Sequence, residues 1–404
     1  MKPPLIFALL TVTAVCLFGL IAAQTRISMQ PFVRVGMQVR DFRNGTNPVL
    51  QSEYPPPASA LFYAFQENPF HRSFNDAWKI FMMLTLAGTC VWTFFRANKR
   101  AAALLPAALL VCIPLLGSEL IFARYDILVT ILLFLTWQAA RTHRTHSAGI
   151  FIGLAASLKI VPILILPFLW LQSPREKRRD VLLGCISGGG IAIVLALLIM
   201  GPSAFTANMD YLRSYHGVRG IQVESTWAGL LFLWSAFSGA ILTIDNIAQS
   251  FEIMGHTMIA TTASLATIAG LALLFLKMIK DRSSAVTFNP AILFLPLLWA
   301  LLTTPVLSPQ YFVWIIPLLL IYSAEELLDD PYRLLPWALL GLTILTAALT
   351  QWIYPVLYDD LLHFRSFLAV VILNIRNGCV AVLIAMLWWS SPNDRSIKHQ
   401  KKHQ

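Results

Sequence analysis

The sequence contains few charged residues. Only 12% of its 404 residues are Asp, Glu, Lys or Arg, whereas soluble globular domains contain about 25%. Hydrophobic residues make up 57% of the chain, and the mean hydropathy is +0.68. This composition excludes an ordinary soluble enzyme and also a disordered chain, which combines low hydrophobicity with high charge. The apolar residues form continuous runs instead of alternating with polar ones, so a transmembrane barrel is excluded too.

Several signature motifs of catalytic sites are also absent. The sequence has no Walker A loop, no GxGxxG that opens a helix, no HExxH and no DxD triplet. The pairs Asp329-Asp330 and Asp359-Asp360 are adjacent acids. We therefore expect neither a metal ion nor an organic cofactor. No internal repeat is evident, which disfavours a transporter built from inverted repeats. The five cysteines lie within apolar runs without a CxxC pair, and we interpret them as packing residues.

What the sequence does contain is a series of long apolar runs. They cover residues 4–23, 77–95, 101–123, 125–140, 147–172, 181–201, 254–276, 288–304, 311–323, 333–352 and 366–389. These runs predict an all-α, polytopic membrane protein with about 12 crossing or partly crossing segments. We favour a retained first helix over a cleaved signal peptide. The predicted organisation is a single transmembrane domain, 1–404, with a first outer loop at 24–76, an outer loop at 202–250 that contains an interfacial or re-entrant helix at 226–250, and a basic cytoplasmic tail at 390–404.

Basic clusters set the orientation. Lys and Arg gather in the segments between apolar runs at 96–100, 141–144, 175–179, 277–282 and 395–402. Cytoplasmic loops of membrane proteins carry such an excess. We therefore attribute the net charge of +10 to Lys and Arg residues in cytoplasmic loops, and we expect no nucleic-acid partner. The predicted location is the inner (plasma) membrane, with both termini in the cytoplasm.

The run 147–172 has basic flanks at both ends. A single straight helix would place these flanks on opposite sides of the membrane. The run also contains Lys159 in its middle and Pro162 three residues later. We interpret it as two short helices, 147–159 and 160–172, that enter the membrane and return. Lys159 is then either a functional group at membrane depth or a lysine that snorkels to the interface.

This orientation gathers polar residues on the non-cytoplasmic side. Acidic, basic and aromatic groups occur there, and they suit a lipid-anchored anionic substrate, because Arg and Lys bind phosphate and a carboxylate accepts a proton from an attacking hydroxyl. The candidate substrate-binding residues are Tyr54, Arg124, Asp126, Lys159, His216, Arg219, Gln222, Glu224, Ser308, Gln310 and Tyr311. Lys159, Arg124 and Arg219 are the predicted phosphate ligands. The simpler interpretation of Arg124 and Asp126 is an ion pair at the end of a span.

The motifs in these segments resemble a known family. They are Glu53-Tyr54-Pro55-Pro56, Arg124-x-Asp126, Ala148-Gly149, Gly153-Leu154-Ala155, Ser157-Leu158-Lys159 with Pro162, Arg219-Gly220-x-Gln222-x-Glu224-Ser225 and Ser308-Pro309-Gln310-Tyr311. In this order they resemble glycosyltransferase family 87 of the GT-C superfamily, whose members are similar to the polyprenol-phosphate-mannose-dependent mannosyltransferases of bacterial envelopes. The resemblance extends over about residues 5–325. It implies a metal-independent, inverting transfer of a hexose from a polyprenyl-phosphate-sugar to a lipid-linked or glycan acceptor at the outer face.

The general base is where the sequence departs from this resemblance. The family's usual base is an Asp early in the first outer loop, and its expected position falls near Gln30 or Pro31. The first acids present in the loop are Asp41 and Glu53. Asp41 lies between two arginines, whereas prolines after Glu53 restrict its backbone. Both are candidate catalytic residues, and the resemblance favours Asp41 slightly.

Two other functions remain as alternatives, a flippase or transporter of lipid-linked sugars and a non-catalytic subunit that retains the GT-C fold. A transporter requires charges along a path through the membrane. Lys159 and Arg376 are the clear intramembrane charges, and the simplest interpretation of Arg376 is a structural arginine capped by carbonyls.

Overall fold

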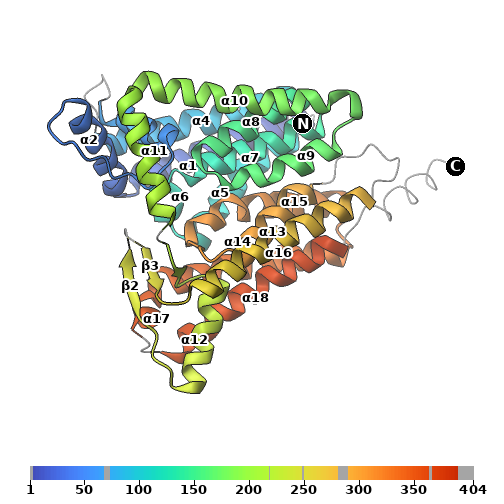
Figure 1. Cartoon of the computed structure of the whole chain (residues 1–404). Coiled ribbons are helices and arrows are strands. Elements are labelled where there is room, and N and C mark those ends of the chain that lie inside the picture. Colours follow the sequence, from blue (N-terminus) through green and yellow to red (C-terminus); the bar gives the residue numbers. More distant parts are fainter. Residues whose placement is uncertain are drawn as a thin grey trace. The chain divides into compact units, whose positions relative to one another are not determined.

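The structure is a computed structural model that describes residues 3–67, 73–217, 219–247, 250–280, 290–363 and 366–389. Helices dominate these residues (Figure 1), and three short strands are the only strands within the described ranges. The long helices that match predicted spans are α1 (Pro3–Gln24), α4 (Phe74–Arg96), α5 (Lys99–Leu116), α7 (Asp126–Arg141), α10 (Arg178–Met200), α13 (Thr257–Lys280), α16 (Leu334–Gln351) and α18 (Phe367–Trp389). The predicted tail 390–404 lies outside the described residues.

Length and composition confirm the all-α, polytopic prediction. Within the described ranges, eight helices are long and apolar enough to cross a membrane, and four shorter apolar helices accompany them. The shorter ones are α8 (Thr145–Leu158), the segment Val161–Gln172, α12 (Thr226–Ser238) and Leu293–Thr303 within α14 (Ala291–Thr303). Residues 147–172 are indeed broken, because α8 ends at Leu158 and is followed by a 3-10 turn, η1 (Val161–Ile165), and by α9 (Leu166–Gln172).

Three boundaries differ from the prediction. The run 101–123 is interrupted by Gly117, whose φ of +87° separates α5 from α6 (Ser118–Phe122); only glycine adopts such a conformation without strain. The predicted helix 226–250 ends at Ser238 as α12, and β2 (Ile244–Ile247) and β3 (Ser250–Ile253) follow it. The predicted first outer loop also contains two helices. Prolines near the helix starts favour α2 (Gln30–Arg43) and α3 (Pro56–Gln66).

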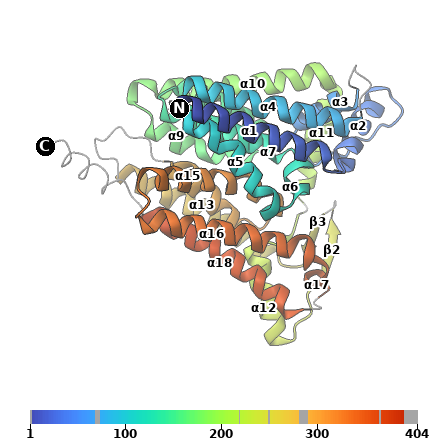
Figure 2. The same cartoon turned by 180° about the vertical axis from the view of Figure 1, so that it is seen from behind.

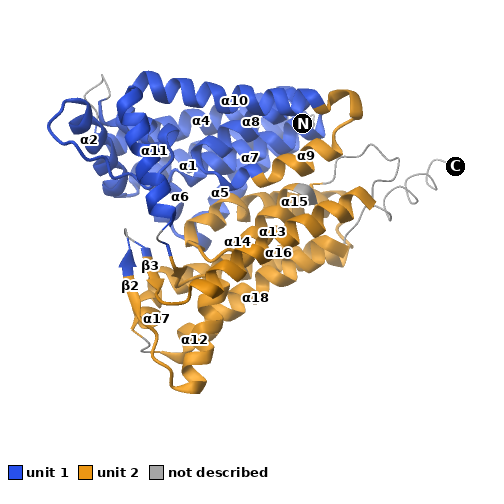
Figure 3. Ribbon diagram, viewed as in Figure 1, with its two compact units in different colours: residues 1–163, 179–219, 246–250 blue, residues 164–178, 220–245, 251–404 orange. Residues whose placement is uncertain are grey.

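The chain divides into two compact units by packing (Figure 3). Unit 1 comprises residues 1–163, 179–219 and 246–250, and unit 2 comprises 164–178, 220–245 and 251–404. In unit 1, α1, α4 and α5 pack side by side, which is clearest from behind (Figure 2). This division concerns packing, and the single transmembrane domain stays a prediction.

Four glycines let α8 and α10 approach closely in unit 1. Gly149 and Gly153 lie on α8, and Gly184 and Gly188 lie on α10, so each helix carries a GxxxG spacing. A Cβ added at any of the four would overlap a backbone carbonyl of the facing helix. Small residues at this spacing allow membrane helices to pack backbone to backbone. This contact holds α8, and hence its C-terminal end at Leu158, against α10.

In unit 2, α12 packs against α18 and α14. The Asn374 side-chain amide on α18 donates to the Gly229 carbonyl of α12 at 3.0 Å, and the Trp227 indole donates to the Thr303 carbonyl at the end of α14 at 2.7 Å. Strand β1 (Ile221–Gln222) pairs antiparallel with β3, within a sheet of order β1-β3-β2. Ser225 caps α12 by accepting from the Ala228 amide. These contacts fix the segment 221–226 at the start of α12.

Candidate functional site

The break after α8 places a lysine at the centre of the candidate site in unit 1. Pro162 has no amide hydrogen to donate to the Leu158 carbonyl four residues earlier, so the helix cannot continue. That carbonyl instead accepts a hydrogen bond from the Tyr125 hydroxyl at 3.2 Å. Lys159 caps α8 in an extended conformation.

Lys159 forms an ion pair with a buried carboxylate. Its Nζ lies 3.7 Å from Oδ1 of Asp126, whose side chain is 1% exposed. The ammonium also lies 4.9 Å from the ring centre of Tyr125 and 5.9 Å from that of Tyr54. A cation over aromatic faces is stabilised by the ring quadrupoles. Arg124 instead faces Glu119 at 3.8 Å, so these contacts differ from the simpler interpretation, in which Arg124 pairs with Asp126.

The two tyrosines belong to an aromatic cluster with Phe32 of α2 and Phe62 of α3. Ring centres within this cluster of four are 4.5–5.7 Å apart, mostly in edge-to-face geometry, which is a favoured arrangement for aromatic pairs. Phe32, Phe62 and Tyr125 are almost fully buried. The helices of the first outer loop thus build one wall around Lys159.

Glu53 is held at the edge of this cluster by its neighbours. The buried side-chain amide of Asn208, on α11 (Pro202–Gly217), donates to the carbonyls of Ser52 and Tyr54 at 3.1 and 3.0 Å. The Ser52 hydroxyl lies 2.8 Å from that of Ser59 on α3. The backbone on both sides of Glu53 is therefore fixed. The Glu53 carboxylate interacts with the Tyr54 hydroxyl. Burial and then the Glu53 carboxylate raise the pKa of Tyr54 well above its ordinary value.

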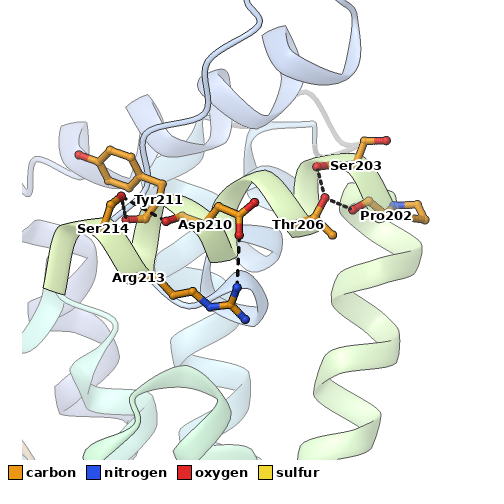
Figure 4. A network of polar contacts seen from close by, with 7 residues as sticks. All are labelled: Pro202, Ser203, Thr206, Asp210, Tyr211, Arg213 and Ser214. Atoms are coloured by element: carbon orange, nitrogen blue, oxygen red, sulfur yellow. Dashed lines mark hydrogen bonds and ion pairs between the residues drawn. The ribbon is translucent and has the colours of Figure 1, made fainter. Parts of the chain in front are cut away.

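Helix α11 supplies further polar groups of unit 1. Tyr211 has a raised pKa, caused by burial and then by Glu53. Figure 4 shows that the exposed Arg213 of this helix pairs with Asp210 one turn earlier, at 3.4 Å. At the end of α11, burial and then the charges of Arg219 and Lys159 lower the pKa of His216.

Arg219 follows α11 and also has partners within unit 1. Its guanidinium lies 5.2 Å from the ring centre of Tyr215 and donates to the Ser250 hydroxyl at 2.9 Å. Lys159 and Arg219 both lie within electrostatic range of His216. Arg124 and Asp126 likewise act on Tyr54.

Most of the predicted site residues of unit 1 therefore form one electrostatic cluster, which we call the Lys159 cluster. It contains Glu53, Tyr54, Arg124, Asp126, Lys159, His216 and Arg219. Asp41 is not brought into it. Asp41 lies in the last turn of α2, not in an irregular turn, and its carboxylate is paired with Arg40 at 3.0 Å. Gln30 and Pro31, the positions at which the family's base is expected, are the first residues of α2.

The other predicted residues lie in unit 2. Gln222 pairs with Glu252 in the β1–β3 register. The backbone N–H of Gln222 donates to the Pro305 carbonyl at 2.9 Å. Ser308 begins the 3-10 helix η3 (Pro309–Trp314), which contains Gln310 and Tyr311. The ring of Tyr311 stacks on Trp314 with centres 4.7 Å apart. Ser308 thus caps a helical turn.

Glu224 joins these motifs through an arginine of α18. Arg376 is fully buried, its Nη2 donates to the Glu224 carbonyl at 2.5 Å, and its guanidinium carbon lies 4.9 Å from the ring centre of Phe312 in η3. The predicted carbonyl cap of Arg376 is confirmed for this one nitrogen. Within the described residues, its Nε and Nη1 have no hydrogen-bond partner, nor does Oε2 of Glu224. Burial raises the pKa of Glu224 to about 8, although the charge of Arg376 opposes the shift.

Sequence reasoning missed the residues that position the site. Tyr125 is the middle residue of the Arg124-x-Asp126 motif. Only its position between these two charged residues could have marked it as part of the site. Asn208 and Phe32 belong to polar or amphipathic segments without a motif, so nothing in the sequence marked them. Arg376 was noticed as an intramembrane charge, but its contact with Glu224 spans 152 residues.

The helical fold and the buried polar cluster at a helix break define a polytopic membrane protein with a chemically equipped site. The family comparison adds the activity. The model of glycosyltransferase family 87 matches residues 53–309, which is well over half of the chain, and the protein belongs to this family of membrane glycosyltransferases. The matched region begins at Glu53 and excludes Asp41. No curated protein and no solved structure matches the chain.

Proposed function

We propose that the protein transfers a hexose, in the first instance mannose, from a polyprenyl-phosphate-sugar to a lipid-linked or glycan acceptor at the non-cytoplasmic face of the plasma membrane. Members of the family are GT-C-type mannosyltransferases, which supports the sugar. The main observation that supports this proposal is the Lys159 cluster. It combines cations suited to a phosphate with a positioned carboxylate on the same unit.

Glu53 is the general base in this proposal. A base must be held in one direction, and Asn208 and Ser59 fix the residues on both sides of Glu53. Asp41 is instead paired with Arg40 at 3.0 Å. In the reaction, an acceptor hydroxyl oxygen bonds to the anomeric carbon while the bond from that carbon to the phosphate oxygen breaks. The hydroxyl proton passes to Glu53, polyprenyl phosphate leaves with the bonding electrons, and the single displacement inverts the anomeric configuration.

Lys159, Arg124 and Arg219 are the proposed ligands of the donor phosphate. Each has a partner in the structure, respectively Asp126, Glu119 and Ser250. A phosphate that enters the cluster exchanges these contacts for charge-assisted bonds, for which Arg offers a planar fork and Lys a point charge. The Asp126 carboxylate keeps the Lys159 ammonium in place until the donor arrives.

The test uses the full chain in lipid nanodiscs with a short-chain polyprenyl-phosphate-mannose and measures donor consumption. We expect Glu53→Gln to lower turnover by about 10²–10⁴-fold, the usual contribution of a general base, while donor binding is retained. Asp41→Asn is the matched control and should keep near-normal turnover. Normal turnover by Glu53→Gln would exclude Glu53 as the base, and a collapse in Asp41→Asn would transfer the role to Asp41. Consumption of a nucleotide-sugar in place of the lipid-linked donor would reject the proposed donor.

A further inference from the structure

Unit 2 contains a cavity that shares no lining residue with the Lys159 cluster. It has a volume of about 350 Å³ and lies among α12, the C-terminal end of α14 and the middle of α18. Pockets for small molecules occupy about 300–1,000 Å³ and combine apolar walls with a few placed polar groups. Leu230, Leu302 and Ala381 contribute apolar wall, and none of the described residues that line the cavity is charged.

Two polar residues of the lining lack partners. Asn377 on α18 is 3% exposed, and within the described residues neither its amide oxygen nor its amide nitrogen has a hydrogen-bond partner. The Thr226 hydroxyl at the start of α12 is in the same condition. The other polar lining residues are satisfied, since Thr303 donates to the Trp299 carbonyl at 2.7 Å and Asn374 donates to the Gly229 carbonyl at 3.0 Å.

Unsatisfied buried groups of this kind are costly. A buried donor or acceptor without a partner costs about 1–3 kcal/mol, and native proteins seldom leave a side-chain amide without any bond. A ligand that enters the cavity therefore lowers the free energy of the protein if it supplies both an acceptor for the Asn377 amide nitrogen and a donor for the Asn377 amide oxygen. The packing of Asn374 on the adjacent turn shows that an amide on this face can be satisfied by the protein itself.

The lining also restricts the chemistry of the ligand. A phosphate is disfavoured, because no Lys, Arg or His lines the cavity among the described residues. A pure hydrocarbon would leave Asn377 and Thr226 unsatisfied. An uncharged glycerolipid fits both conditions, since its acyl chain matches the apolar wall, its ester carbonyls accept hydrogen bonds and its free hydroxyl donates one.

We propose that this cavity binds one uncharged glycerolipid of the diacylglycerol type, with an acyl chain against Leu230, Leu302 and Ala381 and its polar end on Asn377 and Thr226. The α18 helix, which is long and apolar enough to cross a membrane, brings the cavity to the source of such lipids. The proposal does not depend on the transferase activity or on its donor.

The experiment uses the full chain in nanodiscs and a diacylglycerol that carries a diazirine in one acyl chain. After irradiation, peptide mapping should place the label on α12 and α18. Gly378→Leu fills the cavity, and because no heavy atom lies within 4 Å of a Cβ added at Gly378, the helix accepts the side chain. We expect this variant to lose the label. Gly341→Leu is the matched control, since Gly341 on α16 is equally open but does not line the cavity, and it should label like the wild type.

A second arm tests the polar contact. Asn377→Leu keeps the volume and removes the amide, so its affinity for diacylglycerol should fall by about 2–10-fold, the effect of one ordinary hydrogen bond. Competition by hexadecane should be weaker than by unlabelled diacylglycerol. Undiminished labelling of Gly378→Leu, equal competition by hexadecane, or displacement by polyprenyl phosphate in preference to diacylglycerol would overturn the proposal. Gel filtration and the unfolding midpoint of each variant identify any loss of label that comes from misfolding, in which case Ala381→Leu replaces Gly378→Leu as the filling variant.

Discussion

Replacing Gly188 by alanine tests the close packing of α8 on α10. A Cβ at this position would overlap the Ile150 carbonyl oxygen of the facing helix, well inside 3.0 Å. A backbone oxygen cannot move aside as a flexible side chain does, so the helices must separate. Overpacking of this kind costs about 1–3 kcal/mol, which exceeds the gain of about 0.5–1 kcal/mol from replacing a helical glycine by alanine. The free energy of unfolding should therefore fall.

Gly190, two residues further along the same helix, provides the matched control. No heavy atom lies within 4 Å of a Cβ added there, so Gly190→Ala keeps only the gain in helix propensity and should leave stability equal or slightly higher. The assay is unfolding in mixed micelles by increasing sodium dodecyl sulfate, followed by tryptophan fluorescence. Because α8 ends beside Lys159, Gly188→Ala should also lower donor binding. Equal shifts of the unfolding free energy in both variants would refute the close contact.

Two further predictions concern buried charges. Lys159→Met removes the ammonium that lies 3.7 Å from the buried Asp126 carboxylate, so the free energy of unfolding should fall, because a buried charge loses one of its compensating contacts. Adding Asp126→Asn should recover part of that loss, and simple additivity in this cycle would show that the two groups are not coupled. Burial raises the pKa of Glu224 from 4.5 to about 8. As pH rises, Glu224 therefore loses its proton in the unfolded state before it does so in the folded state. The free energy of unfolding should consequently fall as pH rises from about 4.5 to about 8. Glu224→Gln should remove this component of the pH profile, and an unchanged profile would contradict the assignment.

Long apolar runs and helix-breaking residues were enough to predict most helices. The break after α8 followed from Pro162 and Lys159, and the structure shows the reason, since the Leu158 carbonyl is released to Tyr125. The break at Gly117 was missed, because one glycine within an apolar run does not reveal that its φ is positive. The strands after Ser238 were missed too, since their pairing depends on the distant segment 221–222.

The residue types of the site were easier to predict than their partners. The Arg124-x-Asp126 spacing suggested an internal pair, but burial of Asp126 within α7 and the extended backbone of Lys159 bring these two residues together instead. Asn208 contacts Ser52 across 156 residues, and no local pattern encodes such a contact. The proposal of Glu53 over Asp41 as the general base likewise rests on tertiary contacts that a motif does not contain.

The interleaving of the two units has a consequence for biosynthesis. The segment 164–178 belongs to unit 2 but is synthesised before the last two segments of unit 1, 179–219 and 246–250. Domains generally fold in order as they leave the ribosome, but here unit 1 is complete only at residue 250, after the segments 164–178 and 220–245 of unit 2 have been made. Residues 164–178 must wait in the membrane for at least the segment that starts at Gly220. No single peptide bond therefore separates the residues of unit 1 from those of unit 2, and a chain stopped before Gly220 would contain residues 164–178 without the rest of their unit.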